Sequence, residues 1–166
     1  MTNKKMKGKE LYIIAHNIRS AHNVGAIFRS SDGAGVDKIF LSGYSQRPAS
    51  ADKQDLVKPE KMLAKTALGA ELSVAWEGAD DLVKLINKLK KEGVQIVALE
   101  KTEGSVDIRK FQPTFPMALI LGHEVDGVKD EVLQLCDAVI EIPMRGQKES
   151  LNVSVATGIA IYELLG

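Results

Sequence analysis

The sequence predicts an α/β fold built on a mostly parallel β-sheet that is flanked by helices. Short continuous apolar runs, typical of strands buried on both faces, alternate along the chain with segments of helical periodicity. With 166 residues, of which 45% are hydrophobic, the chain has enough apolar material for one ordinary core. We therefore expect a basic N-terminal extension over residues 1–10 and a single domain over residues 11–166.

The expected elements follow one another in a regular order. The apolar runs that we interpret as strands are residues 11–15, 38–42, 72–76, 94–99, 117–121 and 138–142. The first helix should begin near Asn23 and end at Gly33 or Gly35, because glycine readily adopts the left-handed conformation that ends helices. Further helices are expected over residues 60–68, 80–92 and 130–135, and from Asn152 towards the C-terminus.

The segment from Gly146 to Glu163 is the most informative stretch. A polar loop leads into Ser150, which is well placed to cap the last helix. This helix is apolar on most of its faces, so we expect it to be buried on most sides. Gly158 costs about 1 kcal/mol relative to alanine in a helix interior. Its presence indicates either tight helix packing or the close approach of another backbone or a ligand.

Charge is unevenly distributed along the chain. The 22 basic and 22 acidic residues cancel, which argues against an obvious nucleic-acid-binding protein. However, residues 1–65 carry 12 basic against 6 acidic residues, and residues 66–166 carry 10 against 16. The first half could form a basic surface for phosphates, or its lysines could be a solvated scatter. The cations concerned are Lys4, Lys5, Lys7, Lys9, Arg47, Lys53, Lys58, Lys61 and Lys65.

Several classes of protein are disfavoured by the sequence. The single cysteine, Cys136, cannot form an intramolecular disulfide, and the N-terminal apolar run is too short for a signal peptide or a membrane span. We therefore expect a cytoplasmic protein with no membrane partner. The histidines and Cys136 lack metal-ligand spacing, so no metal is expected. Gly33-Ala34-Gly35 ends a helix instead of beginning one, so it is not a dinucleotide-binding motif.

Three separated motifs follow the ends of predicted strands. They are residues 23–25 with Arg29, residues 121–124 with Gly127, and residues 142–144 leading into 150–154. In open parallel sheets, ligands bind beyond the carboxyl ends of the strands. The motifs are therefore expected to form one site.

Together these motifs resemble the SpoU/TrmH-type RNA ribose methyltransferases of the SPOUT superfamily, from about Leu11 to the C-terminus. The resemblance implies a homodimer with a C-terminal trefoil knot, which transfers a methyl group from S-adenosyl-L-methionine to a ribose 2′-hydroxyl of tRNA or rRNA. It implies cofactor contacts at Leu99, Gly122, Ile142, Met144 and Leu151. It also implies catalytic roles for Asn23, Arg29, Glu124, Ser150 and Asn152.

The chemistry of these residues limits what they can do. Methyl transfer requires two aligned reactants and a destination for the hydroxyl proton. Arg29 is the family's candidate base, but a guanidinium keeps its proton in proteins, so we expect a fixed cation that stabilises the 2′-oxyanion. Asn23 would orient Arg29 or close the loop before its helix. Ser150 and Asn152 could instead cap a helix, and Glu124 could anchor a loop.

Two other functions remain open at this stage. The chain could be a catalytically silent RNA-binding module that kept the fold, or an α/β enzyme that acts on a small nucleotide-like substrate. Because only residues 1–10 precede the first strand, we expect RNA recognition by the catalytic dimer itself, with help from the lysine-rich segments.

Overall fold

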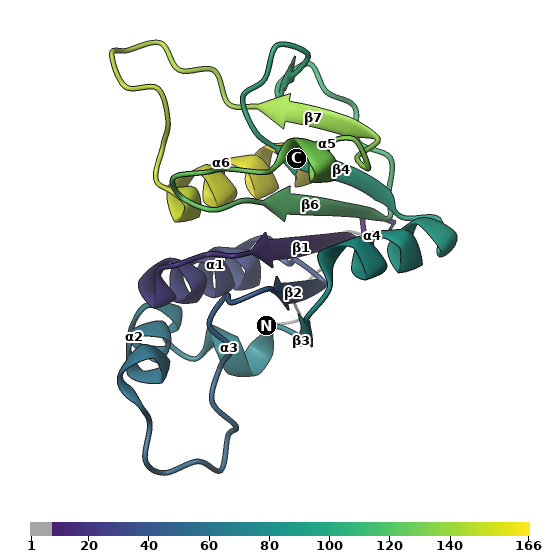
Figure 1. Cartoon of the computed structure of the whole chain (residues 1–166). Helices are drawn as coiled ribbons and strands as arrows, with labels where there is room; N and C mark the ends of the chain where they lie inside the picture. The colour runs from purple at the N-terminus through teal and green to yellow at the C-terminus, as the bar shows by residue number, and fades with distance from the viewer. Residues whose placement is uncertain (1–7) are drawn as a thin grey trace.

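Seven parallel strands form one sheet with the order β3-β2-β1-β6-β4-β7-β5 (Figure 1). The computed structural model describes residues 8–166, so Lys4, Lys5 and Lys7 of the expected extension lie outside the described residues. The predicted parallel α/β sheet is therefore confirmed, whereas the trefoil knot stays a prediction.

The elements alternate between strand and helix over most of the chain. The strands are β1 (Leu11–His16), β2 (Lys38–Ser42), β3 (Trp76–Ala79), β4 (Gln95–Leu99), β5 (Val106–Asp107), β6 (Met117–Leu121) and β7 (Ala138–Glu141). The helices are α1 (Ala21–Ala34), α2 (Lys58–Ala67), α3 (Ala70–Ser73), α4 (Leu82–Lys91), α5 (Asp130–Leu133) and α6 (Val153–Leu165). Gly35 ends α1 in the left-handed conformation, and it is one of the two glycines at which this helix was predicted to end.

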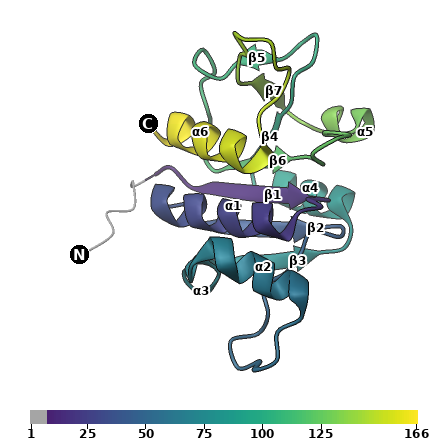
Figure 2. The same ribbon diagram turned by 90° about the vertical axis from the view of Figure 1, so that its left-hand side faces the viewer.

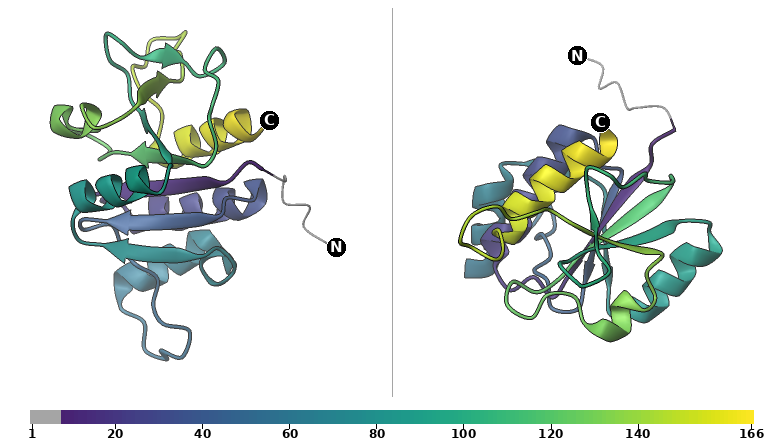
Figure 3. Two further views of the ribbon diagram at one scale, coloured as in Figure 1. Left: turned by 90° about the vertical axis from the view of Figure 1, so that its right-hand side faces the viewer. Right: turned by 90° about the horizontal axis from the view of Figure 1, so that it is seen from above.

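Helices cover both faces of the sheet. Figure 2 shows α1, α2 and α6 on one face, and Figure 3 shows α4 and α5 on the other. Adjacent residues of β1 face the two layers, since Ile13 packs with the core beneath α1 and α6, and Ile14 packs with the core beneath α4. Both side chains are fully buried. This two-sided burial is the reason that the strands appear as continuous apolar runs.

Two details of the predicted elements were wrong. The run 72–76 is not a strand, because α3 continues through Ser73 and β3 begins only at Trp76. Ala70 and Val74 are buried at helical spacing while Leu72 is exposed, and so short a run does not separate the two periodicities. The two-residue edge strand β5 was not predicted, because it is too short to produce a pattern.

Gly25, part of the first motif, has a structural role. A Cβ atom added there would lie 2.2 Å from the carbonyl oxygen of Leu63 and 2.1 Å from the hydroxyl oxygen of Thr66, both on α2. The Thr66 hydroxyl also donates a 2.7 Å hydrogen bond to the carbonyl oxygen of His22. Gly25 therefore allows the close crossing of α1 and α2 and needs no contact with a ligand.

The last helix, α6, packs beside α1 with only one of its faces covered. Its buried residues are Thr157, Ala160, Ile161, Leu164 and Leu165. Val155, Ile159 and Tyr162 are 50%, 44% and 58% exposed, so the prediction of burial on most sides is wrong for the single chain. A Cβ atom added at Gly158 would lie 3.6 Å from the Ser30 hydroxyl, which is ordinary packing. No helix within residues 8–166 has the length and apolar character needed to cross a membrane.

Candidate functional site

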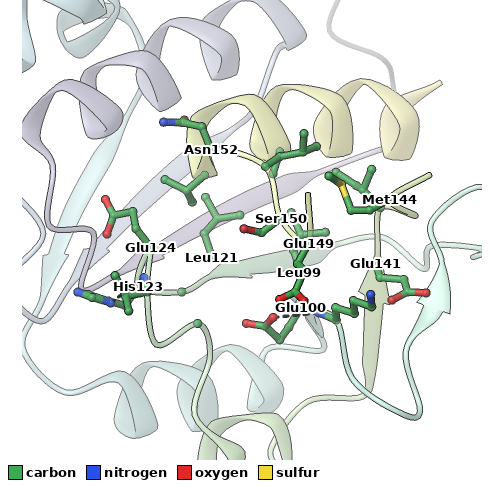
Figure 4. Close-up of a pocket in the computed structure, with 18 residues that line it drawn as sticks. Leu99, Glu100, Leu121, His123, Glu124, Glu141, Met144, Glu149, Ser150 and Asn152 are labelled. Carbon is green, nitrogen blue, oxygen red and sulfur yellow. Dashed lines mark hydrogen bonds between the residues drawn. The ribbon is translucent and has the colours of Figure 1, made fainter. Parts of the chain in front are cut away.

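A cleft of about 450 Å³ lies beyond the carboxyl ends of β4, β6 and β7 (Figure 4). Strand-end residues Leu99, Leu121 and Glu141 line it, together with the loop after β6 and the segment that leads into α6. Figure 4 shows Glu124 and Asn152 at one end of the cleft and Glu141 and Met144 at the other. The cleft therefore occupies the edge of the sheet at which the sequence predicted a site.

Most of the predicted site residues meet at this cleft. Lining it are all five predicted cofactor-binding residues, Leu99, Gly122, Ile142, Met144 and Leu151, and three of the predicted catalytic residues, Glu124, Ser150 and Asn152. Asn23 does not line the cleft but is hydrogen-bonded to two residues that do. Arg29 neither lines the cleft nor contacts this group. The roles of these residues stay predictions.

The loop after β6 forms a wall of tightly packed backbone. A Cβ atom added at Gly122 would lie 2.4 Å from the carbonyl carbon of Gly127. One added at Gly127, where φ is +65°, would lie 2.1 Å from the Glu100 carboxylate. That carboxylate in turn accepts a 2.9 Å hydrogen bond from the backbone N–H of Val128. The two glycines thus serve the packing of this loop and leave its backbone facing the cleft.

One chain of hydrogen bonds joins the three motifs. The side-chain amide of Asn23 donates to Oε1 of Glu124 at 3.2 Å, and the amide of Asn152 donates to Oδ1 of Asn23, also at 3.2 Å. These residues come from α1, from the loop after β6 and from the start of α6. Asn23 therefore links the other two motifs and fixes one end of the cleft.

Glu124 is held by the N-terminal end of α1. Its carboxylate accepts hydrogen bonds from the backbone N–H groups of Arg19, at 3.0 Å, and Ser20, at 3.2 Å. Partial burial raises the pKa of Glu124, but hydrogen bonds from the backbone of Arg19, of Glu124 itself and of Ser20, and from Asn23, outweigh it and lower the pKa. An ionised carboxylate whose two oxygens already accept hydrogen bonds is an anchor and a poor proton acceptor.

Asn152, and not Ser150, caps the last helix. Its Oδ1 atom accepts hydrogen bonds from the backbone N–H groups of Ser154, at 2.9 Å, and Val155, at 3.4 Å. The prediction that Ser150 caps this helix is wrong, because α6 begins only at Val153. Both residue types are good N-caps, so composition could not separate them. Ser150 is exposed at the cleft and its hydroxyl has no hydrogen-bond partner within residues 8–166.

Arg29 lies on a different part of α1. Six residues separate it from Asn23, which corresponds to about 9 Å along a helix and a different helix face. Its side chain is exposed and makes no hydrogen bond or ion pair with any residue in the described part of the chain. Gly33, one turn further along on the same face, would carry a Cβ atom 3.0 Å from the hydroxyl of Tyr162. Arg29 is therefore near the exposed face of α6.

Several lining residues were not predicted from the sequence. Glu100, Glu141 and Glu149 add carboxylates to the cleft, and two of them could have been found by their position at the ends of β4 and β7. His123 was part of a motif but was given no role. Its Nδ1 atom accepts 3.0 Å hydrogen bonds from the backbone N–H groups of Val125 and Asp126, so its ring proton lies on Nε2.

The cleft holds no cluster suited to a metal. Among residues 8–166, no group of three or more His, Cys, Asp or Glu side chains is arranged to hold an ion. The Asp126 carboxylate lies 3.5 Å from Nδ1 of His123, but this atom accepts hydrogen bonds and carries no proton, so the contact is not an ion pair.

The parallel sheet and the cleft at its carboxyl edge define an α/β protein with a candidate ligand site beyond its strands. The family model described as the SpoU rRNA Methylase family matches residues 10–162. The chain therefore belongs to this family of RNA methylases, which confirms the resemblance found in the sequence.

Relatives with assigned activities match almost the whole chain. The tRNA (guanosine(18)-2'-O)-methyltransferase of Aquifex aeolicus is 36% identical, over 93% of this chain and 68% of the relative. A 23S rRNA (guanosine-2'-O-)-methyltransferase of Ralstonia nicotianae is 30% identical, over 95% of this chain and 59% of the relative. The AdoMet-bound rRNA methyltransferase from Sinorhizobium meliloti has a TM-score of 0.83 at 28% identity, over 95% of this chain and 56% of that chain. The chain thus spans between 56% and 68% of the length of these proteins.

The capping role of Asn152 can be separated from its link to Asn23. Asn152→Ala removes both, and we expect it to lower the free energy of unfolding by about 0.5–2 kcal/mol. Asn152→Asp keeps a good cap but loses the amide donor to Asn23, so most of that stability should be retained. Denaturant unfolding measures both effects. Ser150→Ala is the matched control and should leave the free energy of unfolding unchanged. A loss of stability equal to that of Asn152→Ala would show that Ser150 caps the helix.

Proposed function

We propose that this chain is an S-adenosyl-L-methionine-dependent methyltransferase that modifies a ribose 2′-hydroxyl of tRNA or ribosomal RNA. The observation that carries the proposal is the Glu124–Asn23–Asn152 hydrogen-bond chain at one end of a nucleotide-sized cleft. Family membership and the activities of the Aquifex and Ralstonia relatives support it. We further propose that residues 11–166 form one domain and that the protein is cytoplasmic.

The residues of the cleft fit the proposed cofactor. A volume of about 450 Å³ lies in the range of small-molecule sites, which are mostly apolar with a few polar groups. Leu99, Ile142, Met144 and Leu151 supply apolar surface for an adenine ring, and the packed backbone at Gly122 supplies hydrogen-bonding groups. S-adenosyl-L-methionine would supply the methyl group. The AdoMet-bound Sinorhizobium structure supports this assignment.

The chain's own polar residues would position the ribose. The free hydroxyl of Ser150 can hydrogen-bond to the acceptor sugar, and the anchored Glu124 and Asn152 keep that end of the cleft in shape. Because Glu124 already accepts several hydrogen bonds, we do not assign it the 2′-hydroxyl proton. Arg29 would act as a fixed cation beside the developing oxyanion. In the single chain Arg29 lies outside the cleft, so this role requires a second copy of the chain.

A homodimer would satisfy this requirement. Val155, Ile159 and Tyr162 form an exposed apolar stripe on α6, and Leu151 at the cleft continues it. A helix that is apolar on most sides is normally buried. Arg29 borders this stripe, because its face of α1 reaches Tyr162 through Gly33. Two copies packed through the stripe would therefore bring each Arg29 close to the partner.

The dimer can be tested by placing a charge in the stripe. We expect Ile159→Glu to dissociate the dimer, since the new carboxylate would have to be buried without a partner. Analytical ultracentrifugation measures the change in mass. Val83→Glu on α4 is the matched control, because Val83 is 45% exposed and Ile159 is 44% exposed. A wild-type protein that sediments as a monomer would rule out this arrangement.

Methyl transfer is tested first by calorimetric titration with S-adenosyl-L-methionine and then by transfer of a labelled methyl group to unmodified tRNA and rRNA transcripts. The modified position should resist alkaline hydrolysis, which needs a free 2′-hydroxyl. We expect Arg29→Ala to keep cofactor binding but to lose about 10²–10³-fold in rate, as on removal of an oxyanion donor.

The same experiment decides between the alternative functions. Cofactor binding without transfer to any RNA would contradict the proposed activity. RNA binding without cofactor binding would favour the silent RNA-binding module. Transfer of the methyl group only to small nucleotides would favour an α/β enzyme that acts on a small nucleotide-like substrate.

The lysines within residues 1–65 include a candidate surface for binding RNA phosphates. Arg47 pairs with Asp80 and Lys53 with Glu60, which removes two of the predicted cations from consideration. The remaining lysines of the segment lie exposed along α2 and are Lys58, Lys61 and Lys65. Their spacing of three and four residues places them on one helix face. We propose that this face binds RNA phosphates.

Charge reversal of these three lysines to glutamate should weaken tRNA binding and reduce its salt dependence. The logarithm of the affinity falls linearly with the logarithm of the salt concentration, and each lost phosphate contact makes this slope shallower by about 0.9. Affinity for S-adenosyl-L-methionine should not change. Reversal of the exposed residues Lys84, Lys88 and Lys91 on α4 is the control. Equal losses in both triple variants would indicate a general charge effect and not a site on α2.

A further inference from the structure

Tyr44 is an exposed aromatic residue held beside the cleft. Its side chain is 59% exposed, and its ring meets that of His123 edge-to-face, with centroids 6.4 Å apart and planes at 80°. His123 lines the cleft and directly precedes Glu124 (Figure 4). The two rings therefore continue the wall of the cleft outward from the end at which Glu124, Asn23 and Asn152 are joined.

The turn that carries Tyr44 is firmly held. The backbone N–H of Tyr44 donates to Oδ1 of Asn17 at 3.1 Å, and Asn17 itself has a φ of 51°. Gly43 has a φ of 61°, and a Cβ atom added there would lie 1.8 Å from the same Asn17 oxygen. On the other side, Ser45 is 4% exposed and its hydroxyl accepts a 2.8 Å hydrogen bond from the N–H of Ile18. The ring is thus presented to solvent on an ordered support, which reduces the entropy cost of binding.

Tyr44 keeps an open face, whereas the His123 side chain is only 15% exposed and supports the Tyr44 ring from one side. The orientation of His123 is fixed by the hydrogen bonds that its Nδ1 atom accepts from Val125 and Asp126. An edge-to-face pair leaves at least one face of each ring uncovered by the other. The Tyr44 hydroxyl has no hydrogen-bond partner within residues 8–166. Tyr44 is therefore neither a core residue nor a member of a polar network.

The surroundings of the pair are polar and carry charges of both signs. Arg19 is exposed and its backbone is bonded to Glu124, while its guanidinium has no partner among the described residues. Lys129 is close enough to add to the effect of burial in lowering the pKa of His16. Asp126 and Glu124 are the acidic residues beside the pair, and the Glu124 carboxylate already accepts hydrogen bonds from the backbone of Arg19 and Ser20. Aromatic faces combined with cations are the means by which proteins bind unstacked RNA bases and their phosphates.

We propose that Tyr44, supported edge-to-face by His123, forms a stacking platform for the nucleobase attached to the ribose that is methylated. The inference rests on the proposed function, because it assumes that a ribose lies between Ser150 and the end of the cleft at Glu124. A 2′-hydroxyl reaches a recessed site only when its nucleotide leaves the stack of its neighbours. Stacking on Tyr44 replaces part of the base stacking that is lost. Arg19 would bind a flanking phosphate.

The platform is tested with a short single-stranded RNA that carries 2-aminopurine, a fluorescent base whose emission is quenched when it stacks on an aromatic ring. The wild-type protein should quench this probe in a saturable manner. Tyr44→Ala should weaken its binding by about 5- to 150-fold, the range found for removal of one base-stacking side chain. Tyr44→Phe and Tyr44→Trp should retain binding, since they keep an aromatic face.

Matched controls separate stacking from folding and from loss of the proposed function. Val83→Ala, which truncates an exposed apolar residue on the opposite layer, should bind the probe as the wild type does. Tyr44→Ala should keep its affinity for S-adenosyl-L-methionine and its thermal unfolding midpoint. If the wild type fails to quench the probe, or if Tyr44→Ala quenches it with unchanged affinity, the platform is refuted. If quenching depends on Tyr44 but no cofactor binds, the proposed methyl transfer fails while the platform remains.

Discussion

The side-chain amide of Asn23 is the interaction on which the site depends. Its nitrogen donates to Glu124 and its oxygen accepts from Asn152, so each half of one amide group holds a different motif. An amide is suited to this task because it is a donor and an acceptor at once and carries no charge that would have to be neutralised. A carboxylate or an ammonium group at this position could satisfy only one of the two neighbours.

The rest of the fold brings these three residues to one place. The parallel sheet sets the carboxyl ends of β1 and β6 side by side, so the start of α1 and the loop after β6 leave the sheet together. The close crossing of α1 and α2 at Gly25 and the packing of α6 against α1 then fix the height and direction of both helices. The site is in this sense a product of the core, although few of its residues are buried.

Much of this arrangement was predictable from the sequence. Continuous apolar runs predicted the strands, and the rule that ligands bind at carboxyl strand ends placed the three motifs at one edge of the sheet. The family resemblance implied Leu99, Gly122 and Ile142 as cofactor contacts, and all three line the cleft. The Asn23–Asn152 hydrogen bond was not predictable, because it joins residues 129 positions apart and depends on how two helices dock. Ser150 was mistaken for the cap because two good capping residues stand two positions apart. The separation of Arg29 from the cleft was missed, although the six-residue spacing from Asn23 within the predicted helix already places the two side chains on different helix faces.

The double use of Asn152 has a consequence for how the site comes into being. The same side chain caps α6 and holds Asn23, so the first turn of the last helix and one end of the cleft are formed by a single residue. The folding of the C-terminal helix and the ordering of the end of the cleft at Glu124, Asn23 and Asn152 are then thermodynamically coupled. A chain that has folded its sheet but has not yet docked its final helix lacks this end of the site.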